Sequence, residues 1–98
     1  MIYKTPYAEY DVVVIFERYQ NNRIAIELVD KNDGEPICMA TVNIPEAPLA
    51  DNEIIIKNYS ENEGVLEFLQ KNSYVGKTLR MVQAGYAKAN VVNLLKSE

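Results

Sequence analysis

The chain has 98 residues, one cysteine, no histidine and a formal net charge of −4. This length suits one small domain, residues 1–98, and the lack of histidine excludes Ser-His-Asp and Cys-His catalysis and most zinc chemistry. The acidic balance also argues against direct nucleic-acid binding, because contact with phosphates requires clustered Lys and Arg.

The apolar runs and the single cysteine indicate the cellular compartment in which the protein works. No run approaches the roughly 20 apolar residues that cross a bilayer, and the first ten residues lack the apolar centre of a signal peptide. Cys38 lies in an apolar segment without a second cysteine, so we expect a buried, unpaired structural thiol. The composition therefore predicts a cytoplasmic protein that does not contact a membrane.

Residues 1–10 contain Tyr3, Tyr7 and Tyr10 together with Pro6. Pro6 argues against a central strand, since proline has no N–H group for the ladder. Two interpretations stay open. The segment is either a loosely attached arm whose rings serve an interface, or it lies against the body and its rings cover one end of the core.

The next part of the chain predicts an antiparallel meander. Three segments rich in β-branched residues read as strands: 11–18, 23–30 and 37–44. The first is apolar on both faces, which predicts a central strand that is covered on both sides for part of its length. Asn21 and Asn22 suit the first tight turn, and Asp33-Gly34 is a strong hairpin signal for the second.

The stretch from 52 to 72 holds the clearest helix of the chain. Residues 53–57 form a short β-branched run that predicts a fourth strand. Ser60 and Glu63 have the spacing of a capping box, in which each side chain accepts the backbone N–H of the other, so we expect the helix to begin after Ser60. One apolar helix face is predicted from four residues: Val65, Leu66, Phe68 and Leu69.

The end of the chain is less regular. Residues 78–83 alternate like a strand, and residues 86–95 fit either a helical stripe or a returning strand, of which we favour the strand. The predicted fold class is therefore α+β. We expect an antiparallel sheet of four to six strands, beginning with the β-meander, with one main helix packed on it.

The candidates for catalysis are few. No phosphate-binding glycine loop occurs, and the segment 31–35 is too short for a calcium-binding EF-hand loop. A carboxylate-based enzyme would have to use residues such as Asp51, Glu53, Glu61 and Glu63. Because helix capping and solvation already explain these carboxylates, we predict no enzyme activity, no cofactor and no metal site.

A different hint comes from the junction between the predicted fourth strand and the helix. Polar and amphipathic side chains gather around it: Asn43, Lys57, Asn58, Tyr59, Glu61 and Asn62. We interpret them as a candidate surface for an unidentified protein partner, and the alternative is that they serve only as caps and turns. An exposed sheet edge would also permit a homodimer.

Several phrases carry a family resemblance. The residues 41–45 (TVNIP) and 56–66 (IKNYSENEGVL), together with 28–30 and 33–36, resemble a family of short uncharacterised proteins encoded by bacteria, their phages and conjugative elements. The resemblance covers most of the chain from about Val12. It implies a mobile-element origin and no particular activity, cofactor or catalytic residue.

This resemblance suggests an alternative function. Small acidic proteins from such elements are sometimes inhibitors of host defence nucleases, which they block by occupying the nucleic-acid groove. Mimicry of phosphates would require a row of carboxylates on one face. The candidates are Glu17, Glu27, Asp30, Asp33 and Glu35.

Overall fold

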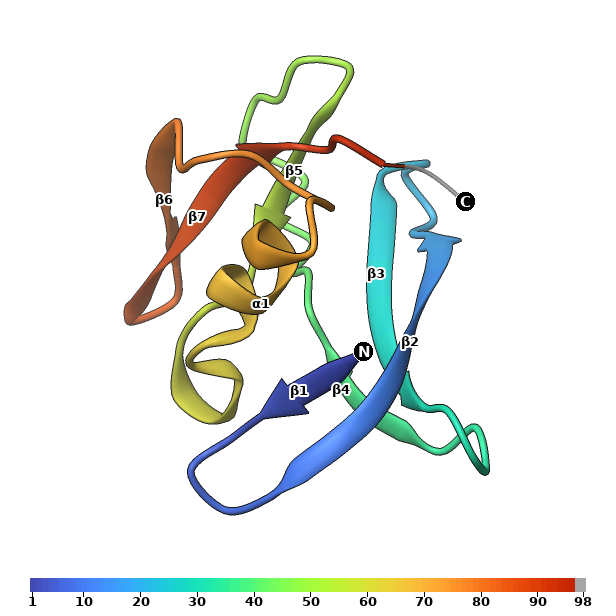
Figure 1. Ribbon diagram of the computed structural model, residues 1–98. Helices are drawn as coiled ribbons and strands as arrows, with labels where there is room; N and C mark the ends of the chain where they lie inside the picture. The colour runs from blue at the N-terminus through green and yellow to red at the C-terminus, as the bar shows by residue number, and fades with distance from the viewer. Residues whose placement is uncertain (97–98) are drawn as a thin grey trace.

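A computed structural model describes residues 1–96, which form two antiparallel sheets and one α-helix (Figure 1). The strand order is β1-β2-β3-β4 in the first sheet and β5-β7-β6 in the second. The predicted α+β class is confirmed, whereas the predicted single sheet is matched only in part because the strands divide between two sheets. The strands are β1 Ile2–Lys4, β2 Glu9–Arg18, β3 Ile24–Asp30, β4 Pro36–Met39, β5 Glu53–Ile56, β6 Arg80–Ala84 and β7 Ala87–Asn93.

The predicted meander is the central part of the first sheet. β2 pairs antiparallel with β3, and β3 pairs antiparallel with β4. The two turns use residues that tolerate positive φ, namely Asn22 at 70° and Gly34 at 75°. The predicted third strand, 37–44, is shorter than expected, because regular pairing with β3 ends at Met39.

The chain leaves the first sheet at this point and joins the second. Ala40 N donates to Ile26 O of β3, and Lys57 N donates to Ala40 O, both at 2.8 Å. Two residues on, Val42 N donates to Ile55 O of β5 at 3.1 Å. Residues 40–42, which we call the crossing segment, therefore hydrogen-bond to both sheets and hold them together.

The helix begins later than predicted, and the capping box is wrong. Ser60 begins a short 3₁₀ turn, η1 (Ser60–Asn62), and α1 spans Val65–Lys71 with no side-chain cap from its preceding residue, Gly64. Gly64 has a φ of 100°, which glycine adopts without strain but which separates the two helical segments. The orphan N–H groups of Gly64 and Leu66 instead donate to Asn58 Oδ1, at 3.1 and 3.0 Å. Neither Ser60 nor Glu63 caps α1.

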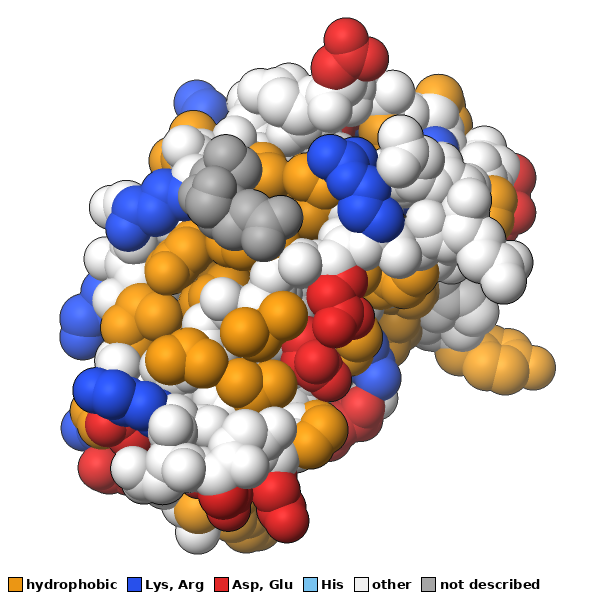
Figure 2. Space-filling view, turned by 90° about the vertical axis from the view of Figure 1, so that its right-hand side faces the viewer, with side chains coloured by type: hydrophobic (Ala, Val, Ile, Leu, Met, Phe, Trp, Pro, Cys, Tyr) orange, Lys and Arg blue, Asp and Glu red, His pale blue; other side chains and the backbone are white. Residues whose placement is uncertain are grey.

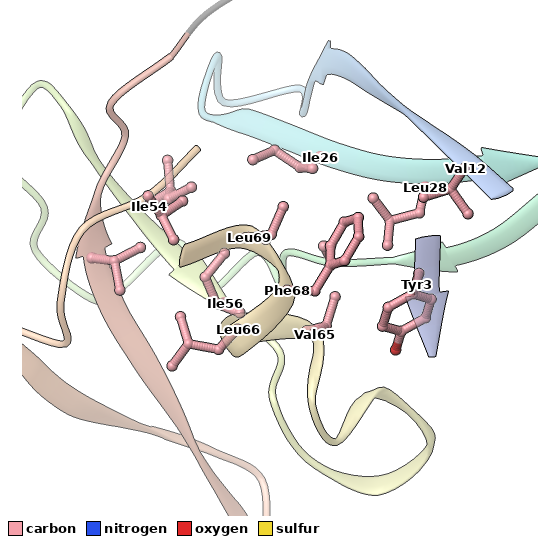
Figure 3. Close-up of a cluster of buried hydrophobic side chains, with 13 residues drawn as sticks. Tyr3, Val12, Ile26, Leu28, Ile54, Ile56, Val65, Leu66, Phe68 and Leu69 are labelled. Carbon is pink, nitrogen blue, oxygen red and sulfur yellow. The ribbon is translucent and has the colours of Figure 1, made fainter. Parts of the chain in front are cut away.

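The main core lies where α1 packs between the two sheets (Figures 1 and 3). The predicted apolar helix face is confirmed, since all four of its residues are buried. A second cluster fills the opposite face of the second sheet, beneath the loop that follows the crossing segment. The main core comprises Tyr3, Val12, Ile26, Leu28, Ala40, Ile54, Ile56, Val65, Leu66, Phe68, Leu69, Val75 and Val92.

The N-terminal segment lies against the body. β1 pairs with β2, and Tyr3 is only 2% exposed, with its ring 5.2 Å from that of Phe68. Tyr7, by contrast, is exposed in the loop between the strands. Of the two interpretations of residues 1–10, the structure therefore agrees with a segment that covers one end of the core.

The C-terminal part forms a hairpin. β6 and β7 are joined through Gly85, whose φ is 63°, and β7 lies between β5 and β6. The strand interpretation of residues 86–95 is thus confirmed for Ala87–Asn93. The one α-helix of residues 1–96 is too short to cross a membrane.

Candidate functional site

The structure brings four of the six predicted binding residues together. Asn43, Lys57, Glu61 and Asn62 line a shallow pocket of about 390 Å³ between β4 and η1. The remaining two residues, Asn58 and Tyr59, line a different hollow beside the start of α1. The predicted cluster is therefore divided between two neighbouring surfaces.

Asn62, the last residue of η1, and Asn58, which precedes η1, both have structural roles. Asn62 is 2% exposed, and its Nδ2 donates to Met39 O at 2.6 Å, which ties η1 to β4. Asn58 provides the acceptor for the first turn of α1. Their amide groups are already used inside the molecule, which agrees with the interpretation of the junction as caps and turns.

The other four residues also have intramolecular partners. Lys57 Nζ and Glu61 Oε1 form an ion pair at 2.5 Å, and Lys57 Nζ lies 5.6 Å above the centre of the Tyr59 ring. The hydrogen bond between Lys57 and Glu61 lowers the pKa of Glu61 and raises the pKa of Lys57. Asn43 Oδ1 accepts from Asn21 Nδ2 at 3.0 Å. A partner would have to compete with these contacts, so protein binding at this junction stays a prediction.

Glu53 and Glu61 are not arranged as general acids. Arg80 donates to both Glu53 oxygens, at 2.8 and 3.1 Å, and Ala50 N donates to Oε1 at 2.9 Å. The hydrogen bonds from Arg80 lower the pKa of Glu53 to about 2. Glu61 is likewise held ionised by Lys57. General acid catalysis needs a raised carboxyl pKa, which neither side chain has. Residues 1–96 also contain no group of three or more Cys, Asp and Glu side chains that could hold a metal ion.

The Glu53–Arg80 pair predicts an acid-dependent loss of stability. The pKa of Glu53 falls from an ordinary 4.5 to about 2 on folding, so the pair stabilises the fold fully above about pH 4.5. This contribution is lost as the pH falls from 4.5 towards 2. We expect the free energy of unfolding of the wild type to exceed that of Glu53→Gln at pH 5 and to approach it near pH 2.

Urea unfolding at a series of pH values measures this difference. Arg80→Met is the matched control, because it leaves the carboxylate in place and returns its pKa towards 4.5. At pH 5, the free energy of unfolding of Arg80→Met should be close to that of the double variant with Glu53→Gln and Arg80→Met. A stability difference between wild type and Glu53→Gln that stays constant from pH 5 to pH 2 would show that the ion pair does not couple folding to protonation.

A surface that the sequence interpretation missed lies on the first sheet. The strand register places Val13 opposite Val29, Ile15 opposite Glu27, and Met39 opposite Glu27 on the other side. Paired residues point to the same face, and this face is opposite to the one that carries Val12 into the core. We call the face the outer face. Four side chains form what we call the outer apolar stripe: Val13, Ile15, Val29 and Met39.

The outer apolar stripe is accessible to solvent. Ile15 is 36% exposed and Met39 37%, Val13 and Val29 are half-buried, and none of the four belongs to either core cluster. Figure 2 views the molecule from the side of β2 and β3 and shows hydrophobic side chains gathered at the surface beside acidic ones. The prediction that the first long strand is covered on both sides is therefore wrong for this part of β2.

Acidic side chains accompany the outer apolar stripe. Glu17 pairs with Ala25, two residues from Glu27, so the two carboxylates are diagonal neighbours on the outer face, where such positions lie about 7–8 Å apart. The longer predicted row is broken. Asp30 Oδ1 accepts from Asn32 N at 2.7 Å, and Asp33 Oδ1 accepts from Glu35 N at 2.9 Å. Asp30 and Asp33 thus form the turn instead of extending the row.

Comparison with protein-family models, with curated proteins and with solved structures gives no significant match. The resemblance to short proteins of bacteria, phages and conjugative elements stays a prediction.

Proposed function

We propose that the protein is a non-enzymatic protein-binding module that docks its partner on the outer apolar stripe. The observation that supports this function is a group of partly exposed apolar side chains on one face of the first sheet. Val13, Ile15 and Val29 are neighbours on β2 and β3, and Met39 lies on β4 across Glu27. Contiguous apolar patches rimmed by polar residues are typical of interaction sites on soluble proteins. The strands hold these side chains at fixed spacings, so a partner would meet a preformed surface with little ordering cost.

The charge around the stripe indicates the chemistry of the partner. Glu17 and Glu27 lie within the outer face, and Glu27 separates Ile15 from Met39. A partner that covers the stripe must place positive charge against these carboxylates, because burying them unpaired would be costly. The partner is therefore a protein with an apolar patch that is flanked by Lys or Arg.

The contacts of the carboxylates support a role without catalysis. Glu53 and Glu61 are each paired with a cation and have lowered pKa values. These pairs serve packing and solubility and leave neither group ready to transfer a proton near neutral pH. A binding function requires no such group.

Inhibition of a host nuclease by acidic mimicry is the second candidate. The diagonal arrangement of Glu17 and Glu27 favours it, since two carboxylates on one face can replace two phosphates. The apolar residues between and beside them favour a mixed interface over pure mimicry. The salt dependence of binding distinguishes the two candidate functions. The affinity of a mimicry complex should fall steeply as the salt concentration rises, and that of a largely apolar interface should not.

The test compares capture of host proteins by the wild type and by two variants. Ile15→Glu places a charge in the outer apolar stripe, and Tyr86→Glu places the same charge on the fully exposed hairpin tip of the second sheet. We expect one dominant protein to be retained by the wild type and by Tyr86→Glu, and its retention to fall at least about tenfold with Ile15→Glu, equivalent to about 1.4 kcal/mol.

Thermal unfolding verifies that both variants remain folded. Met39→Lys provides a second disruption of the stripe from a different strand. Retention of the same proteins by the wild type and by both stripe variants would exclude this surface as the docking site. Retention of nothing at either low or high salt would contradict a stable protein partner altogether.

A further inference from the structure

The second sheet ends in an open edge at β6. Among residues 1–96, β6 pairs with β7 alone and is the last strand in the order β5-β7-β6. In an antiparallel strand, the N–H and C=O groups of alternate residues point to opposite sides. The groups of β6 that point away from β7 therefore form a row of free donors and acceptors, which is a template for a further strand.

The other three sheet edges are short or already in use. β1 has three residues, and Met39 O of β4 accepts from Asn62 of η1. The crossing segment bonds to β5 on the side away from β7. β6, by contrast, has five residues in unbroken register with β7 and contains neither Pro nor Lys, which commonly protect edges from pairing. Its one charged residue, Arg80, is neutralised by Glu53 at 2.8 Å.

The side chains of β6 leave apolar surface uncovered at this edge. Val82 and Ala84 pack against the second core cluster but are only half-buried, because β6 is the last strand on that side. Met81 points to the opposite face and is 46% exposed, and Leu79, just before the strand, is 42% exposed. A further strand along the edge would cover apolar side chains on both faces.

We infer that β6 pairs antiparallel with β6 of a second copy, which joins two three-stranded sheets into one. A two-fold axis at Val82, the middle residue, pairs all five residues of the strand. Met81 then lies opposite Gln83 of the second copy. Arg80 lies opposite Ala84, so no two charges of like sign face each other. The contact is the same from both sides and closes at two copies.

The second copy is the occupant that this edge indicates. In the register centred on Val82, the two Val82 side chains meet at the axis, so the second core cluster of one copy continues into that of the other. The strand is short, and we therefore expect a weak, concentration-dependent dimer.

The dimer leaves the outer apolar stripe free. Figure 1 shows β6 at the side of the second sheet that lies away from β2 and β3. Two copies joined at β6 therefore present two outer apolar stripes, which would strengthen binding to a partner with two matching sites. The inference itself does not depend on the proposed protein-binding function, because self-association is measured on the protein alone.

Sedimentation equilibrium of the full chain over a range of concentrations tests the dimer. We expect the mass to rise from one copy to two and to stop there. The two Met81 side chains are diagonal neighbours across the axis, about 7–8 Å apart, so Met81→Lys should weaken the dimer at least about tenfold through repulsion. Tyr7→Lys adds the same charge at a 95% exposed site next to the first sheet and should leave the dimer unchanged.

A mixture of two variants separates loss of the interface from loss of the fold. Met81→Lys and Met81→Glu should each be monomeric alone, whereas their mixture should form a mixed dimer because opposite charges then meet across the axis. Four results would overturn the inference: a wild type that stays monomeric up to about 1 mM, growth beyond two copies, a dimer that Met81→Lys leaves intact, or no association in the mixture.

Discussion

Leu69→Ala is expected to lower the free energy of unfolding by about 2–5 kcal/mol, the usual cost of truncating a buried leucine. Leu69 is fully buried in the main core, where α1 packs between the two sheets. A helix of seven residues is not stable alone in water and depends on this packing. Truncation at Leu69 therefore weakens the attachment of α1 to both sheets at once.

Urea unfolding followed by circular dichroism measures this loss. Lys71→Ala is the matched control, because Lys71 lies on the same helix with its side chain exposed, and its truncation should cost only about 0.5 kcal/mol. A loss below about 1 kcal/mol for Leu69→Ala would mean that α1 contributes little to holding the sheets together.

Thr41→Val should destabilise the protein by about 1–3 kcal/mol although the two side chains have nearly the same shape. Thr41 lies in the crossing segment and is 3% exposed. Its Oγ1 accepts from Ile26 N at 3.1 Å and forms a hydrogen bond with the Tyr19 hydroxyl at 2.9 Å. Valine fills the space but leaves the buried Ile26 N–H without an acceptor, and that unpaired group accounts for the cost.

The same substitution at another position provides the control. Thr78 is half-buried, and its Oγ1 accepts from the side chain of Asn90, which can turn to water when the hydroxyl is removed. We expect Thr78→Val to cost about 0.5 kcal/mol or less in the same urea experiment. Equal stability losses at Thr41 and Thr78 would contradict a special role for the crossing segment.

Strand positions were predictable because β-branched alternation is a local signal, but their division between sheets was not. Residues 37–44 read as one strand, although β4 ends at Met39 and the chain then pairs with β5. Alternation tells which side chains share a face and does not tell which strand lies next to them. β1 was missed since its three residues gain strand structure only from pairing with β2.

The errors around the candidate site have similar causes. The capping box at Ser60 and Glu63 satisfies a local rule, but the acceptor for Leu66 N comes from Asn58, eight residues earlier, through a loop whose path depends on the positive φ of Gly64. The sequence predicts that the strand over residues 11–18 is covered on both sides, because it is apolar on both faces. An apolar face does not reveal whether a second layer packs on it. The hollow lined by Tyr3, Cys38 and Glu63 depends on contacts between segments that are about 60 residues apart.

The position of β7 has a consequence for the order of events in folding. The strands of the first sheet pair with their neighbours in sequence, so this sheet can assemble from local hairpins. β7 is central in the second sheet, and Glu53 pairs with Asn93, so this sheet waits for closure of a long loop. During synthesis, the inner face of the first sheet, with Ile26 and Leu28, is uncovered until α1 emerges, and α1 has no second sheet to pack against until the last strand follows. This interval is when we expect the nascent chain to be most prone to aggregate or to engage a chaperone.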